Sequence, residues 1–393
     1  MKNKSALSLI FLTVFIDLLG FGILIPILPA FAKKELGVDE TAIGIAIAIY
    51  SFVQFLFNPF FGKMSDTYGR KPVIVFCLFL NAIGYVIFAF TQSFLMLLFA
   101  RIIAGIGGSS IGVAQAYIAD VTTRENRSKG MGLIGSAFGL GFMFGPLLGG
   151  ILSDYGYMVT GYAAASFSLI AFTLTLIFLP ESNLNREKVN QTKRKLFDIA
   201  GAKKILSKPE LAILITLFFI LTFSIANIYG TFALLGLKVY GFTDLQNGYL
   251  YGIMGFFSAL VQGGLIGYIN KIMSKKYIII IGAFLIMITL AIIPFGQTFL
   301  GMTIIIIFMV YGTSTFQPTV LSLISEVATD SEQGMTLSIN QSFSALARVL
   351  GPLWGGFAFE FLGYPFPFLT GAVFTLIMFL ISIFYLPKII KLD

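Results

Sequence analysis

Residues that serve chemistry in water are scarce in this sequence. Its 393 residues include no histidine and a single cysteine, Cys77. The absence of histidine removes the commonest general base and metal ligand, and one cysteine alone forms no internal disulfide. Charged side chains make up 11% of the chain, whereas soluble globular domains carry about 25%. These shortages exclude a secreted disulfide scaffold, a cytosolic enzyme and a disordered tail protein.

Apolar residues, by contrast, form 57% of the chain and occur in long runs. A membrane-spanning helix needs about 20 mainly apolar residues. The twelve predicted spans are 5–31, 41–62, 73–91, 93–117, 128–153, 158–180, 210–237, 245–272, 277–295, 298–322, 333–360 and 364–387. The first run continues to Phe31 without the cleavage site of a signal peptide, so we expect it to remain as a span. The sequence predicts an all-α membrane protein with twelve transmembrane helices.

A basic stretch divides these spans into two sets of six. Residues 181–209 carry eight Lys and Arg, and we predict a cytoplasmic linker there, between helix bundles formed by 1–180 and 210–393. With the N-terminus in the cytoplasm, 21 of the 26 basic residues fall on the cytoplasmic side. Cytoplasmic loops are enriched in Lys and Arg, so we expect both termini in the cytoplasm. The net charge of +8 then reports topology and not a nucleic-acid partner. The three basic residues on the opposite side are Lys33, Lys34 and Lys238.

The two predicted bundles share an internal repeat. The segment GMGLIGSAFGLGFMFGPLLGG at 130–150 corresponds to GMTLSINQSFSALARVLGPLWGG at 334–356, and Asp120 corresponds to Glu326. Each half has an even number of spans, so both enter the membrane in the same orientation. Parallel repeats are typical of transporters that bind substrate between the halves and rock one half against the other. The repeat therefore favours a transporter.

Three ionisable residues lie well inside predicted spans, namely Asp17, Arg101 and Arg348. Each costs about 2.5 to 3.5 kcal/mol at the centre of a spanning helix, so each is expected to face the protein interior. Asp17 and Arg101 both lie about 18 Å from the cytoplasmic side at the rise of an α-helix. We hypothesise that Asp17 carries a proton and that movement of Arg101 loads and unloads it. The alternative is a permanent ion pair that only orders the first half, although burying a fixed pair rarely adds stability.

Arg348 has three open interpretations. It can bind a carboxylate or phosphate of the substrate, since Arg matches these groups with two hydrogen bonds. It can instead donate to carbonyl groups freed near Gly351 and Pro352, or approach Asp17. Other polar residues in spans are candidates for the lining of a substrate cavity, although a hydrogen bond between helices is the commoner role for each alone. They are Gln54, Asn58, Asn81, Gln115, Asn227, Gln262, Gln317, Asn340 and Gln341.

The chain contains no GxxxxGK[ST] loop, so ATP does not drive the process directly. Without ATP, metal ligands or a nucleophile with its base, an ion gradient is the remaining source of energy, and we expect no cofactor. The fifth span is rich in small residues that let helix backbones approach closely. Their density, repeated in the eleventh span, predicts a moving interface. The residues singled out are Gly141, Gly145, Pro146, Gly149 and Gly150.

Several segments resemble one family. GKMSDTYGRKP at 62–72 resembles the signature loop of the major facilitator superfamily. RIIAGIGGSS at 101–110 and GLGFMFGPLLGG at 139–150 are similar to signatures of its twelve-helix drug/proton antiporters, the latter called the antiporter motif. FIDLLGFGILIPILP, AYIADVT and FLPES are similar to segments of bacterial tetracycline exporters. The resemblance implies the major facilitator fold of two parallel six-helix repeats in a bacterial cytoplasmic membrane.

The resemblance also assigns residues to a cytoplasmic gate that latches the outward-open state. Gly62 is expected to permit tight packing, and Asp66 to lie by the N-terminus of the eleventh span. Arg70 is expected to join a charge cluster with acids and bases of nearby loops. The alternative for all of them is a solvated turn. The gate residues are Gly62, Asp66, Gly69, Arg70, Asp120 and Arg127.

The chain departs from the tetracycline exporters at two positions, Gly84 and Ile286, where they carry membrane acids, and it lacks their histidine. These departures argue against exchange of metal–tetracycline and leave other amphiphilic compounds. We predict a monomeric secondary transporter in the lipid bilayer that exports drugs or amphiphilic small molecules against inward proton flow. The alternative is a carrier of organic anions or metabolites centred on Arg348. No catalytic constellation supports an enzyme.

Overall fold

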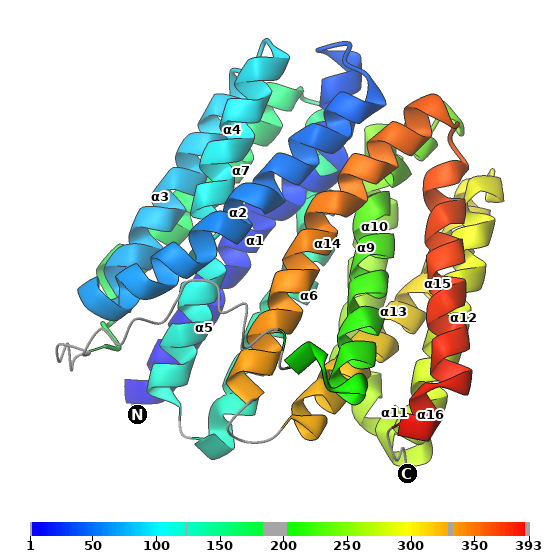
Figure 1. Ribbon diagram of the computed structural model, residues 1–393. Coiled ribbons are helices and arrows are strands. Elements are labelled where there is room, and N and C mark those ends of the chain that lie inside the picture. The colour runs from blue at the N-terminus through cyan, green and yellow to red at the C-terminus, as the bar shows by residue number, and fades with distance from the viewer. Residues whose placement is uncertain (1, 123, 184–202, 204, 329–332, 390–393) are drawn as a thin grey trace. The chain divides into compact units, whose positions relative to one another are not determined.

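A computed structural model describes residues 2–122, 124–183, 203, 205–328 and 333–389, and every regular element in these ranges is a helix (Figure 1). The predicted linker at 181–209 falls largely outside the described residues. The first helices are α1 (Lys2–Lys34), α2 (Glu40–Tyr68), α3 (Arg70–Ala89), α4 (Phe94–Gly107), α5 (Ser110–Val121), α6 (Arg124–Ser153) and α7 (Tyr157–Phe178).

The helices after residue 208 repeat this order. They are α9 (Pro209–Lys238), α10 (Asp244–Leu260), the π-helical turn η1 (Val261–Leu265), α11 (Ile266–Ile272), α12 (Lys275–Ile292), the 3₁₀ turn η2 (Ile293–Phe295), α13 (Phe299–Val327), α14 (Gln333–Phe361), α15 (Phe366–Phe384) and α16 (Leu386–Ile389).

Eleven helices of the described chain are long and apolar enough to cross a membrane. They coincide with eleven predicted spans when α4 is counted with α5, and α10 with η1 and α11. The one remaining predicted span, at 333–360, corresponds to α14, which has 29 residues. Its first half carries Ser, Asn and Gln side chains, which lower its mean hydropathy. The predicted class, an all-α membrane protein of twelve helices, is confirmed.

Two predicted spans are interrupted at pairs of consecutive glycines. The span predicted at 93–117 breaks between α4 and α5. A Cβ atom at Gly107 would lie 2.6 Å from the Asn81 backbone nitrogen of α3, and one at Gly108 would meet the Tyr50 hydroxyl of α2. The span predicted at 245–272 contains the π turn at 261–265, which includes two consecutive glycines. Single π turns of this kind occur mostly inside α-helices.

The described helices group into two compact units. The first unit comprises Met1–Val38, Ile49–Arg194 and Thr243–Gly255, and the second comprises Asp39–Ala48, Lys195–Phe242 and Phe256–Asp393. Consequently α2 begins in the second unit and continues in the first, while α10 begins in the first and continues in the second. The predicted bundles at 1–180 and 210–393 are each continuous in sequence, whereas each unit includes a short helix end from the other half. The two bundles therefore stay a prediction.

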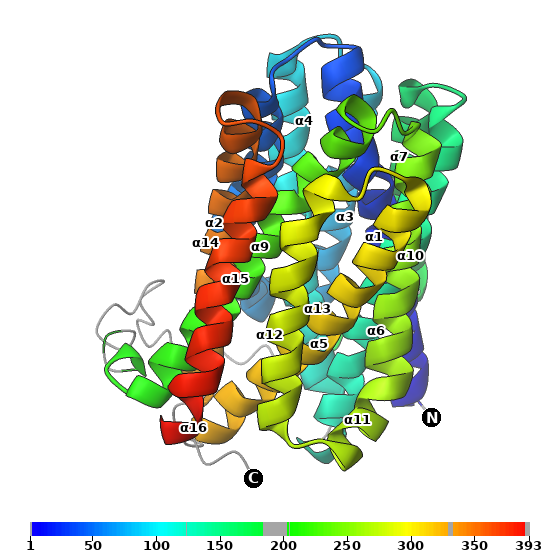
Figure 2. The same ribbon diagram turned by 90° about the vertical axis from the view of Figure 1, so that its right-hand side faces the viewer.

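Each unit has its own packed interior. In the first unit, fully buried side chains of α1, α3 and α5 meet, among them Ile10, Leu78 and Ile118. In the second unit, α9 packs on α14 and α15, and α12 packs against both α13 and α15 (Figure 2). In lipid there is no hydrophobic driving force between helices, so close van der Waals contact and interhelical hydrogen bonds hold them together.

Candidate functional site

Asp17 lies in the interior of the first unit and is surrounded by neutral donors. Its side chain projects from the middle of α1, and the residue is 6% exposed. The Asn81 amide of α3 donates to both carboxylate oxygens, at 3.0 and 3.2 Å. The hydroxyl groups of Ser168 in α7 and Ser110 in α5 donate at 3.1 and 3.4 Å. These four hydrogen bonds come from three helices, so the position of the carboxylate is fixed without a charged partner.

Local backbone geometry builds this shell of donors. Ser110 is the first residue of α5, directly after the break that follows α4. Asn81 lies where Gly107 of α4 leaves room for its amide group. The polar pattern indicated Asn81, whereas Ser110 and Ser168 were missed because spanning helices contain many serines whose hydroxyl groups bond their own backbone. The signal that could have found Ser110 is the GGSS run, which marks a helix break.

Arg101 is also buried, at 6% exposure. Its Cζ atom lies 4.4 Å from the centroid of the Tyr50 ring, a cation–π distance. Among the described residues the donors to Asp17 are all neutral, and the roles predicted for Asp17 and Arg101 stay predictions. The buried hydroxyl of Tyr85, which interacts electrostatically with both residues, has no hydrogen-bond partner among the described residues.

The glycine-rich face of α6 brings helix backbones into contact on two sides. A Cβ atom at Gly141 would lie 2.7 Å from Leu18 Cβ, and one at Gly145 would lie 2.6 Å from Gly22 Cα, both in α1. Gly150 faces the other way, and its Cβ atom would lie 3.1 Å from Asp244 and Gly248 of α10. The five residues of the predicted antiporter motif, which include Pro146 and Gly149, therefore hold α6 against α1 and against the beginning of α10.

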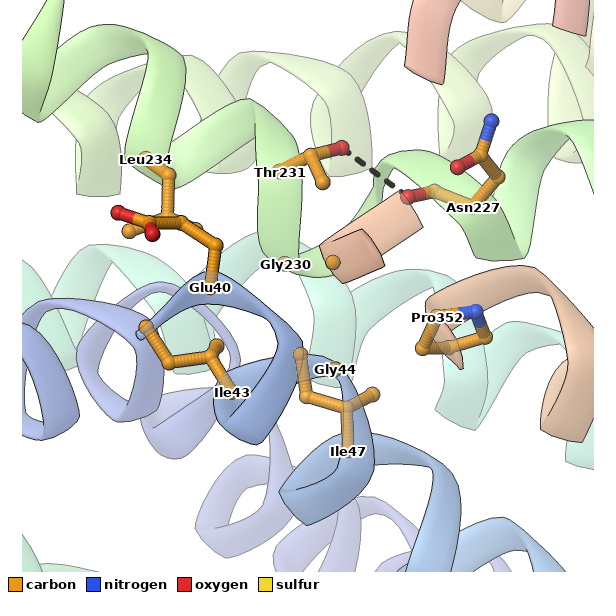
Figure 3. Close-up of a pocket in the computed structure, with 10 residues that line it drawn as sticks. Glu40, Ile43, Gly44, Ile47, Asn227, Gly230, Thr231, Leu234 and Pro352 are labelled. Carbon is orange, nitrogen blue, oxygen red and sulfur yellow. Dashed lines mark hydrogen bonds between the residues drawn. The ribbon is translucent and has the colours of Figure 1, made fainter. Parts of the chain in front are cut away.

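The corresponding face of α14 repeats these contacts in the second unit. A Cβ atom at Gly351 would lie 2.7 Å from the Asn227 backbone nitrogen of α9, and Gly356 faces Glu40 and Gly44 of α2. Figure 3 shows the small cavity between these three helices, with Ile43 and Ile47 directed towards Leu234 and Thr231. Its volume of about 10 Å³ is room for a single water molecule. This cavity is too small for an organic substrate.

The polar residues predicted to line a substrate cavity fall into different surroundings. Asn227 is fully buried and donates to the Pro367 carbonyl group of α15, and Gln54 donates to the Gly108 carbonyl at 2.8 Å. Gln262 donates to Ser258 at 2.8 Å. The bonds of Asn227 and Gln54 join different helices, which agrees with a role in helix packing and not with a cavity lining. Of the remainder, Asn58 and Arg348 are partly buried, Asn340 is fully buried, and Gln115, Gln317 and Gln341 are exposed.

These candidates are divided between the units, so a common cavity stays a prediction. The first unit holds Gln54, Asn58 and Gln115, and the second holds Asn227, Gln262, Gln317, Asn340, Gln341 and Arg348. Arg348 lies near enough to the Tyr229 hydroxyl for an electrostatic interaction. The Asn340 side-chain amide has no hydrogen-bond partner among the described residues, although the residue is fully buried.

A charge cluster lies at the junction of α2, α3 and α5, as the gate residues predict. The Arg70 guanidinium group contacts Asp66 at 2.6 Å and Asp120 at 3.0 Å. Glu181, which sequence reasoning missed as a member, accepts hydrogen bonds from the backbone nitrogens of Arg70 and Lys71, at 2.9 and 3.2 Å. A carboxylate at this position satisfies the free N–H groups at the start of α3 and favours the helix dipole.

Two gate glycines differ in what they do. Gly69 has a φ of 106°, which disfavours any residue with a Cβ atom, and such an atom would collide with Glu181. Gly62, in contrast, has no atom within 4 Å of where its Cβ would lie, so the tight packing expected there is absent from the described part of the structure. The side chains of Arg127 and of the first three residues of α14, beside which Asp66 was expected, lie outside the described part of the structure.

Comparison with known proteins finds relatives along the whole chain. A sequence model of the Major Facilitator Superfamily matches residues 10–328 and 263–391. Multidrug resistance protein 2 of Bacillus subtilis (strain 168) is 28% identical over 378 residues, 93% of this chain and 92% of that one. Tetracycline resistance protein, class H, of Pasteurella multocida is 29% identical over 373 residues, 91% and 90% of the two chains. The crystal structure of the human organic anion transporter MFSD10 has the same fold, with a TM-score of 0.72 at 22% identity, and covers 97% of this chain and 100% of that chain.

Adding one methyl group at Gly145 is expected to destabilise the protein. In Gly145→Ala the new Cβ atom would lie 2.6 Å from Gly22 Cα, and overpacking of this kind costs about 1 to 3 kcal/mol. The matched control is Gly135→Ala on the same helix, where no atom lies within 4 Å and the better helix former stabilises by up to about 1 kcal/mol. Thermal unfolding in detergent measures both, and a melting temperature for Gly145→Ala at or above that of the control contradicts the packing argument.

Proposed function

Since the chain belongs to the Major Facilitator Superfamily, whose members are transporters and not enzymes, we propose that it exports drugs or drug-like amphiphilic compounds in exchange for protons. Relatives at 28% and 29% identity are named multidrug and tetracycline resistance proteins. Their names support an exporter. The buried carboxylate of Asp17 supports protons as the coupling ion.

The surroundings of Asp17 suit a group that alternates between two protonation states. The charged form has four hydrogen bonds from neutral groups, and no cation of the described residues is bonded to it. The neutral form also finds partners there, because a serine hydroxyl both donates and accepts. A fixed salt bridge would hold the carboxylate charged through the whole cycle. Without one, movement of the Arg101 guanidinium towards Asp17 favours the charged form and releases the proton.

The same geometry argues against metal–tetracycline as the substrate. A Cβ atom at Gly84 would lie 2.8 Å from the Ala104 backbone nitrogen, so an acidic side chain has no room there. Ile286 is completely buried in the apolar interior of the second unit. At the two positions where the tetracycline exporters carry acids, this chain thus has a closely packed glycine and a buried isoleucine.

The proposal includes a setting for this transport. It is a bacterial cytoplasmic membrane with both termini in the cytoplasm, which the bacterial exporters among the relatives support. The protein acts as a monomer, without a cofactor, and alternates between two states. Arg70, held between Asp66 and Asp120, belongs to the cytoplasmic latch of the outward-open state.

A second candidate function is transport of organic anions by way of Arg348. This guanidinium lies in the middle of α14, is partly buried, and interacts with the Tyr229 hydroxyl. Arg binds carboxylates and phosphates with two parallel hydrogen bonds. The human relative of known structure is named an organic anion transporter, which supports keeping this candidate.

Replacing Asp17 is expected to abolish proton-coupled export. In proteoliposomes with an imposed pH gradient, Asp17→Asn removes the group that takes up and releases the proton. Uptake of a cationic dye and its proton counterflow then fall to the leak rate of empty vesicles. Glu35→Gln, which removes an exposed acid near the end of α1, is the control and keeps both fluxes. An Asp17→Asn protein that releases as many protons on dye addition as the parent would refute the role.

The anion candidate is tested in the same vesicles with Arg348→Gln. Loss of organic-anion exchange in this variant, together with unchanged dye export, supports the anion carrier and contradicts drug export as the main activity. Proton-driven dye export that persists in Arg348→Gln and disappears in Asp17→Asn supports the proposed exporter.

Asp66→Asn is expected to slow transport while leaving stability nearly unchanged. The Asp66 side chain is 55% exposed, and an exposed ion pair contributes about 0 to 1 kcal/mol. If the latch biases one state by that amount, export changes by up to about fivefold. Asp154→Asn, an exposed acid in the loop before α7, is the control. Unchanged transport and unchanged accessibility of the cytoplasmic side in Asp66→Asn, the latter measured by labelling of an introduced cysteine, would exclude the latch.

A further inference from the structure

The last residue of α1 is joined to the first residue of α10 by a partly buried ion pair. The Lys34 ammonium group lies 3.0 Å from both carboxylate oxygens of Asp244. The Tyr157 hydroxyl of α7 donates to the same carboxylate at 2.7 Å. Asp244 is 8% exposed, so its charge depends on these partners. All three residues belong to the first unit.

A second ion pair joins the last residue of α9 to the first residue of α2. Here the Lys238 ammonium group contacts the Glu40 carboxylate. Glu40 is 5% exposed, and both residues belong to the second unit. One residue further along α2, the Thr41 backbone nitrogen donates to the Glu360 carboxylate of α14 at 3.0 Å. The beginning of α2 is thus held by two acid-mediated contacts.

The two ion pairs are copies of each other in the internal repeat. The lysines are 204 residues apart, and so are the acids. The first lysine pairs with the second acid, and the second lysine with the first acid. Each pair therefore joins one sequence half to the other, and the two pairs are reciprocal.

The packing beside the pairs follows the same repeat. Gly44 of α2 meets Pro352 and Gly356 of α14, and Gly248 of α10 meets Pro146 and Gly150 of α6. Gly44 and Gly248 are also 204 residues apart. Each lysine–acid pair therefore lies one helical turn before a close contact between glycines of two helices.

These pairs also account for basic residues that the predicted topology leaves unexplained. Three lysines fall on the side predicted to be outside, where Lys and Arg are disfavoured. Two of the three, Lys34 and Lys238, are the members of the pairs. Removing one partner of a buried pair leaves an uncompensated charge, so the acid and the lysine of each pair are coupled.

We infer that Lys34–Asp244 and Lys238–Glu40 form a two-part clasp that keeps the ends of α10 and α2 closed against α6 and α14. The beginning of each of these helices lies in one unit and its continuation in the other. Each pair closes its own helix end, so the clasp sets how readily these helix ends separate from α6 and α14, whatever the substrate.

A simpler explanation is that each charge only stabilises its own helix. Acids in a first turn and lysines in a last turn are favourable with the helix dipole, by about 0.3 to 1 kcal/mol each. That explanation predicts the same effect for any reversal of two charges. The clasp predicts that the effect depends on which two charges are reversed.

Two double variants of equal net charge separate these explanations. The inverted variant combines Lys34→Glu with Asp244→Lys and restores one lysine–acid pair. The crossed variant combines Lys34→Glu with Glu40→Lys, which brings two acids together at one pair and two lysines together at the other. The net charge of the chain is the same in both. The reporters are Ile43→Cys and, 204 residues later, Asn247→Cys, each introduced separately with Cys77→Ala; both positions are 1% exposed.

The measurement is the rate at which a maleimide labels each reporter in detergent-solubilised protein. In the crossed variant we expect labelling at both reporters to rise about tenfold over the unmodified clasp, which corresponds to a shift of ~1.4 kcal/mol. In the inverted variant the rate is expected to stay within about threefold of the original, since the dipole terms alone are small. Size-exclusion elution and thermal unfolding check that each variant is folded.

Either of two results would overturn the clasp. One is a folded crossed variant that labels as slowly as the original, and the other is an inverted variant that labels as fast as the crossed one. If the crossed variant does not fold, Lys34→Met combined with Lys238→Met replaces it, and unchanged labelling at both reporters there has the same meaning. The assay uses neither substrate nor gradient, so its outcome is independent of proton-coupled export.

Discussion

Direct contact between helix backbones at glycine is the constraint on which the rest of this structure depends. In lipid, apolar side chains gain little by leaving their surroundings, so helices associate through close packing. On α6, Gly145 lies against Gly22 of α1, and Gly150 lies against Gly248 of α10. One helix face thereby holds two neighbours, one from each half of the sequence. The same arrangement on α14 holds α9 and the beginning of α2. The exchange of helix ends between the two units follows from these contacts.

Burying a charge away from water is costly, and the protein resolves this cost in two ways. Asp244 and Glu40 have lysine partners. Among the described residues, the donors to Asp17 are an amide and two hydroxyl groups. The first arrangement suits a mechanical contact that is either made or broken. The second leaves the charge itself free to change, as the proposed coupling to protons requires.

Sequence patterns predicted the spans, the repeat and the Asp66, Arg70 and Asp120 members of the charge cluster, because each depends on local composition or on a short motif. They did not predict the break at Gly108, since the hydropathy of 93–117 is continuous and the close contact there is with a tyrosine of another helix. They placed Asp17 beside Arg101 from depth alone, and depth gives no rotation about the helix axis. Ser110, Ser168 and Glu181 were missed for a related reason. Their role is defined by what lies opposite them, and a single sequence contains no record of contacts between distant segments.

The repeat is kept at the helix ends and lost in the interior. With the spacing of 204 that relates the two lysines, Asp17 of α1 corresponds to Leu221 of α9. With α3 aligned to α12 and α4 to α13 at their first residues, Asn81 corresponds to Ile286 and Arg101 corresponds to Ile306. All three counterparts are apolar and buried. A movement of two helix ends against two others needs matched contacts on both sides, which preserves the pairs and the glycines. One buried carboxylate is enough to bind one proton, and a second would carry the desolvation cost of another charge. The proposed titrating chemistry therefore has no counterpart at these positions of the second half. Arg348 is not repeated either, since its counterpart by the 206-residue spacing of α6 and α14 is Phe142.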